Sequence, residues 1–306
     1  MINSKTPNVA VLLPSFNGAK FIEAQILSIL KQKDVSLTLY IYDDGSKDET
    51  CSKILKFESE RLKIISSLPD FPGKKSAAKS FFRIIAGIKL EPKYDYIAFA
   101  DQDDIWFSDK IFRAIEYLKN KKYSGYSSSV TAFWQDGKTK FLNKIGNTSK
   151  FNSLFESAGP GCTYVINRKV FDLFKVFLIQ NKEIFKNIDF HDWAIYSFVV
   201  NKGFKWFIDN KPGMFYRQHN NNSFGARDSF EQYIKRLELI MNGWYFSQVN
   251  IFHSLYLTSS IIIKYPKFIF LHRIYFFFMV LIHRRQFFDR ISIALCCLIA
   301  RLKIDD

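Results

Sequence analysis

Four short apolar segments within the first 104 residues constrain the fold of this chain, because helical patterns alternate with them. Each segment is short, apolar and ends in polar residues, as a buried strand does; they are 8–17, 37–46, 62–67 and 94–104. Helical spacing of apolar residues follows in 21–32, 76–88 and 109–120. Ser46 and Glu49 also have the spacing of a capping box and predict a helix start there. This alternation predicts an α/β domain with a mainly parallel sheet flanked by helices.

The ends of the first, second and fourth predicted strands can be placed relative to one another. Pro14–Asn17 end the first strand, Asp43 and Asp44 end the second, and Asp101–Asp103 end the fourth. The carboxyl ends of parallel strands meet at one edge of a sheet, where ligands of open α/β folds bind. We therefore expect these side chains to line a ligand site.

Three carboxylates lie within four residues at the end of the last strand, at Asp101, Asp103 and Asp104. Like charges at this spacing repel each other, and burial adds a desolvation cost. A divalent cation that bridges the acids to a diphosphate would compensate both costs, and Mg²⁺ commonly binds through one or two carboxylates in this way. The alternative is that they cap the helix starting near Asp109, although capping needs only one acid.

Other acid-rich motifs do not fit this stretch. An EF-hand loop needs a ligand and then a glycine at the two positions that Ile105 and Trp106 occupy. A phosphatase with an aspartyl-phosphate intermediate needs a small hydroxyl residue shortly after its second acid, and Ile105 is not one. A glycosidase with two carboxylates has no need of three acids at one strand end. A divalent cation site is the reading that remains.

The net charge limits the expected partners of the chain, and the cysteine content indicates its compartment. The 44 basic and 29 acidic residues give a net charge of +15, which suits a nucleotide, a nucleic acid or an anionic membrane surface. The basic residues are dispersed and no nucleic-acid-binding motif is present, so nucleic acid is not an expected partner. None of the four cysteines has CxxC spacing, which indicates reduced cytoplasmic thiols. The polar residues 1–8 run directly into a strand and predict no signal peptide.

An ordered series of motifs resembles a known family. The motifs are VLLPSFNGAKFIEAQILSILKQ, IYDDGSKDET, FADQDDIW, GPGCTYVINRKVF, HDW and YRQHNNNSFGA. Together they resemble the family-2 glycosyltransferases with a GT-A fold. DQDDIW and the last motif look like the rhamnosyltransferase-type enzymes that build bacterial surface polysaccharides such as O-antigen and capsule. The resemblance covers roughly residues 8–225 and implies a Rossmann-like GT-A catalytic domain at 1–225.

The resemblance also implies roles for individual residues. Asp103 looks like the nearest metal ligand, with Asp101 and His219 as further ligands, and Asp192 matches the general base. The nucleotide sugar would be bound by Pro14, Ser15, Asn17, Asp43, Asp44, Lys79, Asp101, Gln102 and Arg217. The acceptor side would be formed by Gly161, Cys162, His191 and Trp193.

Two positions depart from the family pattern. Lys79 is followed by Ser80, where family members often have Asn, and His191 precedes the base where Glu is frequent. Lys79 can still meet a diphosphate as a point charge. The implied reaction is an inverting transfer that depends on Mg²⁺ or Mn²⁺, with dTDP-rhamnose as the favoured donor. A UDP- or GDP-sugar is an alternative donor, and a catalytically silent scaffold for polysaccharide assembly is an alternative function.

The remaining residues, 226–306, read as a C-terminal helical extension. A helix is expected at 228–242, opened by a capping box of Ser229 and Gln232. The apolar segments 268–282 and 291–300 are shorter than the roughly 20 residues that span a bilayer. Basic residues flank both: Lys264, Lys267, Arg284, Arg285, Arg290, Arg301 and Lys303. This predicts helices on the inner face of the cytoplasmic membrane, beside a lipid-linked acceptor. The alternative is a hairpin buried in the protein or in a homodimer.

Overall fold

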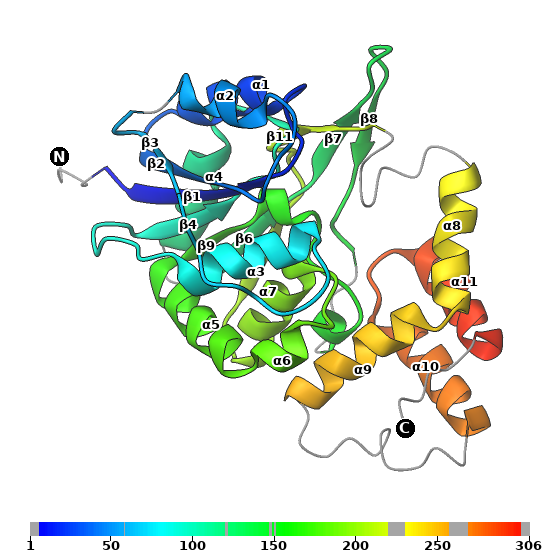
Figure 1. Cartoon of the computed structure of the whole chain (residues 1–306). Helices are drawn as coiled ribbons and strands as arrows, with labels where there is room; N and C mark the ends of the chain where they lie inside the picture. The colour runs from blue at the N-terminus through cyan, green and yellow to red at the C-terminus, as the bar shows by residue number, and fades with distance from the viewer. Residues whose placement is uncertain are drawn as a thin grey trace. The chain divides into compact units, whose positions relative to one another are not determined.

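The computed structural model describes residues 6–57, 59–119, 122–146, 149, 151–219, 230–256 and 269–300. The chain forms two compact units (Figure 1). Unit 1 consists of residues 1–144 and 158–219, and unit 2 consists of residues 145–157 and 220–306. The domain boundary expected at residues 225–226 lies outside the described residues. The segment 145–157 groups with the C-terminal helices and not with the chain on either side of it.

The larger sheet of unit 1 has seven strands in the order β10-β6-β9-β4-β1-β2-β3. Their bounds are β1 (Asn8–Ser15), β2 (Ser36–Asp43), β3 (Leu62–Ile64), β4 (Tyr96–Phe99), β6 (Gly125–Ser128), β9 (Val165–Asn167) and β10 (Trp206–Asp209). Neighbouring strands are parallel except where β9 pairs with β4 and β6. The expected mainly parallel sheet is therefore confirmed. Because β1 lies between β4 and β2, the polar residues that end these three strands share one edge.

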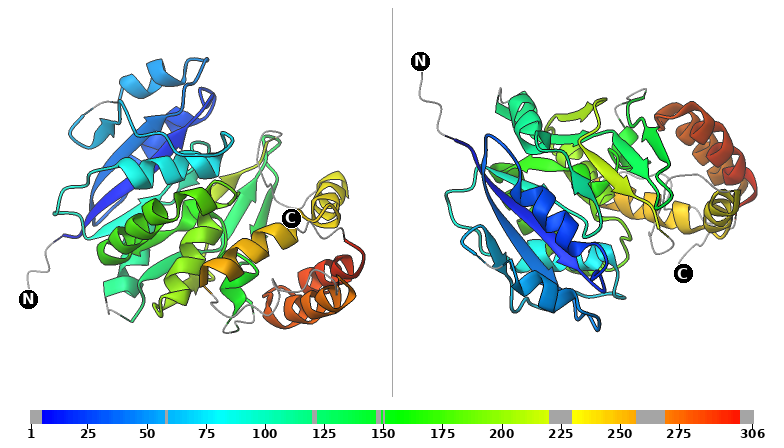
Figure 2. Two further views of the ribbon diagram at one scale, coloured as in Figure 1. Left: turned by 60° about the horizontal axis from the view of Figure 1, so that its bottom comes forward. Right: turned by 90° about the horizontal axis from the view of Figure 1, so that it is seen from above.

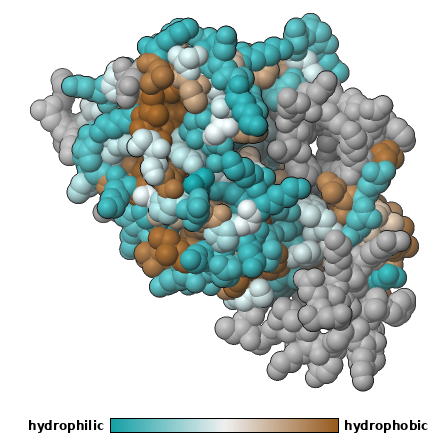
Figure 3. All heavy atoms as spheres, viewed as in Figure 1, coloured by the Kyte–Doolittle hydropathy of each residue, from teal (hydrophilic) through white to brown (hydrophobic). Residues whose placement is uncertain are grey.

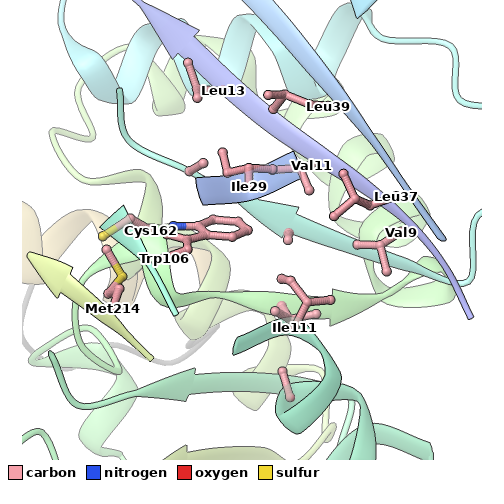
Figure 4. Packing of buried hydrophobic residues seen from close by; sticks show 14 of the residues in the cluster. Val9, Val11, Leu13, Ile29, Leu37, Leu39, Trp106, Ile111, Cys162 and Met214 are labelled. Carbon is pink, nitrogen blue, oxygen red and sulfur yellow. The ribbon is translucent and has the colours of Figure 1, made fainter. Parts of the chain in front are cut away.

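Helices cover both faces of this sheet (Figures 1 and 2). On one face, Val9, Val11 and Leu13 of β1 pack in a single cluster with apolar residues of α1 (Ile22–Leu30), α2 (Thr50–Leu55) and α4 (Lys110–Lys119). Figure 4 shows Trp106, Cys162 and Met214 together at one end of this cluster. The other face carries α3 (Ala77–Gly87), α5 (Arg168–Gln180) and α7 (His191–Asn201), with the short α6 (Lys182–Phe185) beside α5. Each buried Val, Leu or Ile stabilises the unit by about 1.5–3 kcal/mol.

A second, four-stranded sheet lies in unit 1 in the order β5-β11-β7-β8. Its strands are β5 (Ile105–Trp106), β7 (Val130–Phe133), β8 (Thr139–Leu142) and β11 (Met214–Arg217). Trp106 pairs with Met214 and Ile105 pairs with Phe215 in antiparallel register. Since β5 begins directly after the three acids, this register brings β11 and the residues after it alongside them. The small sheet thus joins two segments that are more than 100 residues apart.

The first predicted capping box is wrong. Helix α2 starts at Thr50, and the side chain of the preceding Glu49 makes no capping hydrogen bond. The Ser46 hydroxyl instead donates to Asp43 Oδ1 at 2.5 Å. The same hydroxyl accepts from the Asn17 N–H at 2.8 Å, so the serine belongs to the turn after β2 and not to a helix start. The second predicted box depends on Ser229, which lies outside the described residues.

Unit 2 contains four helices and a short 3₁₀ helix in its described part: η1 (Asn152–Leu154), α8 (Phe230–Met241), α9 (Trp244–Tyr256), α10 (Ile269–His283) and α11 (Phe287–Ile299). Arg284 is buried here: it donates to the carbonyl of Phe155 at 2.9 Å and pairs with Glu156 at 3.6 Å and Asp289 at 3.8 Å. Arg285 is also buried, and its Nε lies 3.5 Å from Glu156. These two arginines therefore do not form the exposed basic edge that the sequence suggested.

Several large apolar side chains of unit 2 are exposed. They lie on α10 and α11: Tyr275, Phe278, Ile282, Phe287, Ile291, Leu295, Leu298 and Ile299. On unit 1 the surface in the view of Figure 3 is mainly hydrophilic, with hydrophobic residues in separate patches. Among the described residues, none of the helices combines the length and the apolar character that crossing a bilayer requires.

Candidate active site

The turn after β2 is held by Asp43. Its two carboxylate oxygens accept hydrogen bonds from Ser15 Oγ at 3.0 Å, from Ser46 Oγ at 2.5 Å and from the Ser46 backbone N–H at 2.8 Å. Burial raises the pKa of Asp43. The hydrogen bonds that its carboxylate accepts, led by those from Ser46, together lower the pKa by more, so it lies below its ordinary value. Asn17 joins the turn by accepting from Lys47 N–H at 2.8 Å, with a φ of 48° that asparagine tolerates. This network fixes the loops that follow β1 and β2 against each other.

Asp44 faces α3. Its Oδ2 accepts from Ser80 Oγ at 2.8 Å, and its Oδ1 lies 3.3 Å from Arg83 and 3.8 Å from Lys75. Arg83 is a site residue that the sequence analysis did not identify. Its guanidinium also lies over the ring of Tyr42, 5.3 Å from the centroid. The Asp44 carboxylate, which is predicted to face the nucleotide base, is therefore held by a hydrogen bond from Ser80 and an ion pair with Arg83.

Gln102 connects the β4 end to the loop after β1. Its amide accepts from Phe16 N–H at 2.9 Å and donates to Phe16 C=O at 3.0 Å. A Cβ at Gly18 would lie 2.2 Å from Gln102 Oε1, so only glycine leaves room for this pair of bonds. Pro14 lies one residue before the end of β1, paired with Tyr42 of β2. Pro14, Asn17 and Gln102 thus lie in or against the loop that follows β1.

Two of the three acids, Asp103 and Asp104, contact Arg217 or His219. The Asp103 carboxylate lies 2.7 Å from His219 Nε2, and the Asp103 carbonyl accepts from Arg217 Nε at 2.7 Å. The Arg217 backbone N–H donates to Asp104 Oδ1 at 3.1 Å. The pairing of β5 with β11 produces these contacts: Phe215 lies opposite Ile105, so the residues after Phe215 run antiparallel past the acids before Ile105. The structure thus brings together Asp103, Arg217 and His219 of the predicted site.

Two of the three acids also form a polar cluster with Cys162. One ligand atom from each of Asp101, Asp104 and Cys162 falls within 4.8 Å of the others, a spacing that could hold a cation. Burial and, to a smaller extent, the neighbouring Asp103 charge together raise the pKa of Asp101 to about 7. Burial likewise raises the pKa of Asp104 and of the Cys162 thiol well above their ordinary values. The buried ammonium of Lys110 lies 3.5 Å from the ring centroid of Trp106, and burial lowers its pKa to about 7.

The start of α7 carries the predicted base. Asp192 lies in the first turn, while the capping position belongs to Phe190, whose side chain makes no capping bond. The charge of Asp192 contributes to the raised pKa of Asp101, so the two carboxylates interact. Trp193 is buried, and its backbone N–H donates to Asp192 Oδ1 at 2.7 Å.

His191 is packed between two elements. Its ring stacks on Phe81 of α3 with centroids 3.7 Å apart, and burial lowers its pKa to about 3. Gly161, in the 3₁₀ helix η2 (Gly161–Thr163), lies on the other side. A Cβ at Gly161 would come within 2.3 Å of His191 Nε2 and 3.0 Å of Asp192 Cβ. The GPGC segment thus approaches the start of α7 closely, as the predicted acceptor side requires.

Lys79 lies apart from these groups. Its ammonium donates to the carbonyl of Ile188 at 2.5 Å, in the segment before α7. Burial lowers its pKa, and the charge of Asp189 partly opposes this effect. In this structure its hydrogen bond is directed to the α7 side and not to the three acids.

Comparisons with known proteins identify the family of this chain. The sequence profile of glycosyl transferase family 2 matches residues 10–189. The chain is 43% identical over 237 residues to the dTDP-rhamnosyl transferase RfbG of Shigella flexneri, which covers 78% of this chain and 82% of RfbG. It is 26% identical over 186 residues to the Escherichia coli enzyme UDP-Glc:alpha-D-GlcNAc-diphosphoundecaprenol beta-1,3-glucosyltransferase WfgD, covering 58% of this chain and 67% of WfgD.

A solved structure shares the fold. The crystal structure of S. aureus TarS 1-349 in complex with UDP-GlcNAc matches with a TM-score of 0.51 and 14% identity, over 90% of this chain and 81% of that chain. The central sheet with helices on both faces is thus a GT-A-like fold with a helical C-terminal end. The chain belongs to glycosyl transferase family 2 and is a glycosyltransferase.

Proposed function

We propose that this enzyme transfers rhamnose from dTDP-rhamnose to a saccharide acceptor in bacterial surface polysaccharide synthesis, with inversion at the sugar. The contact of Asp103 with His219 and Arg217 carries this proposal, because it joins acids and basic groups from distant segments at the sheet edge. The 43% identity to a dTDP-rhamnosyl transferase supports the donor. A UDP- or GDP-sugar is the alternative donor, and a silent assembly scaffold is the alternative function.

A divalent cation fits the donor atoms of the site. Carboxylate oxygens suit Mg²⁺ or Mn²⁺, whereas the Cys162 thiol suits softer ions. Asp103, Asp101 and His219 would hold the cation. The raised pKa of Asp101 supports this reading, since it marks a carboxyl that lacks a compensating positive charge. When bound, the cation supplies positive charge for the diphosphate leaving group.

The nucleotide would be held along the same sheet edge. Pro14, Ser15, Asn17 and Gln102 shape the loop after β1, and Asp43 and Asp44 end β2. Asp44, whose carboxylate lies 3.3 Å from Arg83, would accept from the N–H of the pyrimidine base. Arg217 would contact the diphosphate, for which a guanidinium is suited.

Asp192 would act as the general base for the acceptor hydroxyl. Gly161, Cys162, His191 and Trp193 would form the acceptor side around it. The stacked His191 lies directly before the base in α7, so it limits the movement of that first turn. Lys79 would stabilise the diphosphate only after its bond to Ile188 is exchanged for the ligand.

A panel of nucleoside diphosphate sugars tests the donor and the metal together. Release of nucleoside diphosphate is measured with dTDP-rhamnose, UDP-sugars and GDP-sugars, with and without Mn²⁺ or Mg²⁺. We expect release from dTDP-rhamnose only in the presence of the cation. Asp103→Ala should abolish metal-dependent binding of thymidine diphosphate in isothermal titration, and unchanged binding would refute the metal site.

We also propose that unit 2 attaches the enzyme to the inner face of the cytoplasmic membrane, near a lipid-linked acceptor. The exposed Phe278, Ile282, Leu295 and Ile299 support this, since α10 and α11, which are 15 and 13 residues long, present apolar side chains that suit an interface. The WfgD relative, whose name includes a diphosphoundecaprenol acceptor, supports the lipid link. Sedimentation with anionic liposomes tests it, and Phe278→Ser with Leu295→Ser should reduce binding. A concentration-dependent dimer without liposome binding would favour oligomerisation instead.

A further inference from the structure

Phe21 contacts both basic side chains that approach Asp103. Its ring stacks on the His219 imidazole with centroids 4.9 Å apart and planes 23° apart. The Arg217 guanidinium carbon lies 4.8 Å from the centroid of the same ring. Phe21 comes from the start of α1, almost 200 residues earlier in the chain, and no motif of the sequence analysis assigned it a role.

Each basic side chain is held from two sides. His219 lies between the Phe21 ring and the Asp103 carboxylate, which is 2.7 Å from its Nε2. Arg217 lies between Phe21 and Phe133, whose centroid is 4.5 Å from the guanidinium carbon, while its Nε donates to the Asp103 carbonyl. Aromatic faces attract cations and restrict flat side chains to parallel orientations. Phe133 contacts Arg217, whereas Phe21 contacts both residues.

The Phe21 ring is itself fixed by the backbone. Its N–H donates to the carbonyl of Gly18 at 2.9 Å, and its carbonyl accepts from Gln25 N–H at 3.2 Å as α1 begins. Gly18 is also the residue against which Gln102 packs. Phe21 is therefore hydrogen-bonded to the same loop after β1 that carries the predicted nucleotide contacts.

A cavity of about 220 Å³ opens beside the Phe21 ring. It is lined by Lys20, Phe21, Gln135, Arg217, Gln218 and His219. Three of these side chains carry or can carry positive charge, and Gln135 is an amide with N–H donors, while the Gln218 amide donates to the carbonyls of Tyr216 and Arg217. Such a lining suits the oxygens of a phosphate group. The cavity draws on three separate segments: the start of α1, the β7–β8 turn, and the end of β11 with the residues after it.

We propose that Phe21 is a positioning residue that orients Arg217 and His219 together, so that the cavity beside them binds a phosphate of the donor diphosphate next to the cation. This inference rests on the proposed function and adds Phe21 to it, with Lys20 and Gln135 as further phosphate contacts. The ring does not touch the reacting atoms. It acts through the two side chains that stack on it.

The matched pair Phe21→Leu and Phe133→Leu tests this role. Both changes remove a ring from Arg217 and keep an apolar side chain, but only Phe21→Leu removes the ring from His219. Isothermal titration measures thymidine diphosphate binding by the full chain at a series of Mn²⁺ concentrations. We expect both variants to bind the nucleotide about 3- to 10-fold more weakly at saturating Mn²⁺. Only Phe21→Leu should also raise the Mn²⁺ concentration for half-maximal binding, by about fivefold or more.

Two further variants separate positioning from general damage. Phe21→Tyr keeps the ring and should restore the wild-type Mn²⁺ requirement. In a His219→Ala background, Phe21→Leu should not change the Mn²⁺ requirement further, because the coupled partner is already absent. Should Phe21→Leu fail to fold, Phe21→Met keeps apolar volume without a ring and gives the same readout.

Several outcomes would overturn the inference. It is wrong if Phe21→Leu and Phe133→Leu have equal Mn²⁺ requirements, or if Phe21→Tyr is as impaired as Phe21→Leu. These results would leave the proposed function intact, since wild-type binding of thymidine diphosphate would still depend on the cation. If the wild-type chain binds no nucleoside diphosphate with any cation, the proposed function itself fails.

Discussion

Acidification should destabilise unit 1 through His191, and the size of the effect follows from its burial. The ring is stacked on Phe81, its Nε2 has no hydrogen-bond partner among the described residues, and burial lowers its pKa to about 3. In the unfolded chain its pKa is about 6.5. Between these two values the unfolded state binds a proton that the folded state does not, so stability falls as the pH falls below about 6.5. From pH 7.5 to pH 5.0 this amounts to about 2 kcal/mol.

Denaturant unfolding of the wild-type chain and of His191→Gln at both pH values measures this contribution. Tryptophan fluorescence reports mainly on unit 1, because four of the five tryptophans belong to it. His191→Gln should be less stable at pH 7.5, since it loses the ring stack, but it should lose about 2 kcal/mol less on acidification. Other titrating groups, among them Asp101 and Asp104, contribute equally to both proteins and cancel. Equal losses in the two proteins would show that His191 does not remain neutral in the folded state.

Three further predictions concern close contacts and the base. Gly161→Ala would place a Cβ 2.3 Å from His191 Nε2, so thermal unfolding should reveal a loss of about 1–3 kcal/mol, and a neutral result would contradict the contact. Gly18→Ala would displace the Gln102 amide, and isothermal titration should show about tenfold weaker nucleotide binding, with wild-type affinity as the refuting result. Asp192→Asn should keep nucleotide affinity while turnover falls ~10²–10⁴-fold, and wild-type turnover would exclude it as the base.

The central sheet could be predicted from the sequence because its strands carry strong local signals. β1 and β2 are eight residues each and almost wholly buried, so their apolar runs stand out from the helices between them. The smaller sheet gives no such signal. β5 has two residues and β11 has four, and each becomes a strand only by pairing with a segment far away in the chain.

The same limit applies to the site. Asp103 and His219 were predicted as one site from the ordered motifs, and the structure gives their contact. Phe21 was counted only as part of a helical pattern, since nothing local distinguishes a ring that supports a site from one that fills the core. Arg284 shows the opposite error, because a basic residue beside an apolar helix resembles a membrane flank until its partner, Glu156, is known. Pattern reading identifies residue types at the site, whereas tertiary partners decide what each one does.

The three acids at the end of β4 differ in how their charge is compensated, and the difference indicates where a cation acts. Asp103 has His219, and Asp104 has the Arg217 N–H together with the nearby buried Lys110. Asp101 has no ion-pair partner among the described residues, and its pKa of about 7 shows the cost of its burial beside other acids. A divalent cation would favour its ionised form, so cation binding near neutral pH would release a proton. Repulsion among adjacent acids thus favours cation binding at Asp101, while His219, Arg217 and Lys110 compensate the other two acids without a cation.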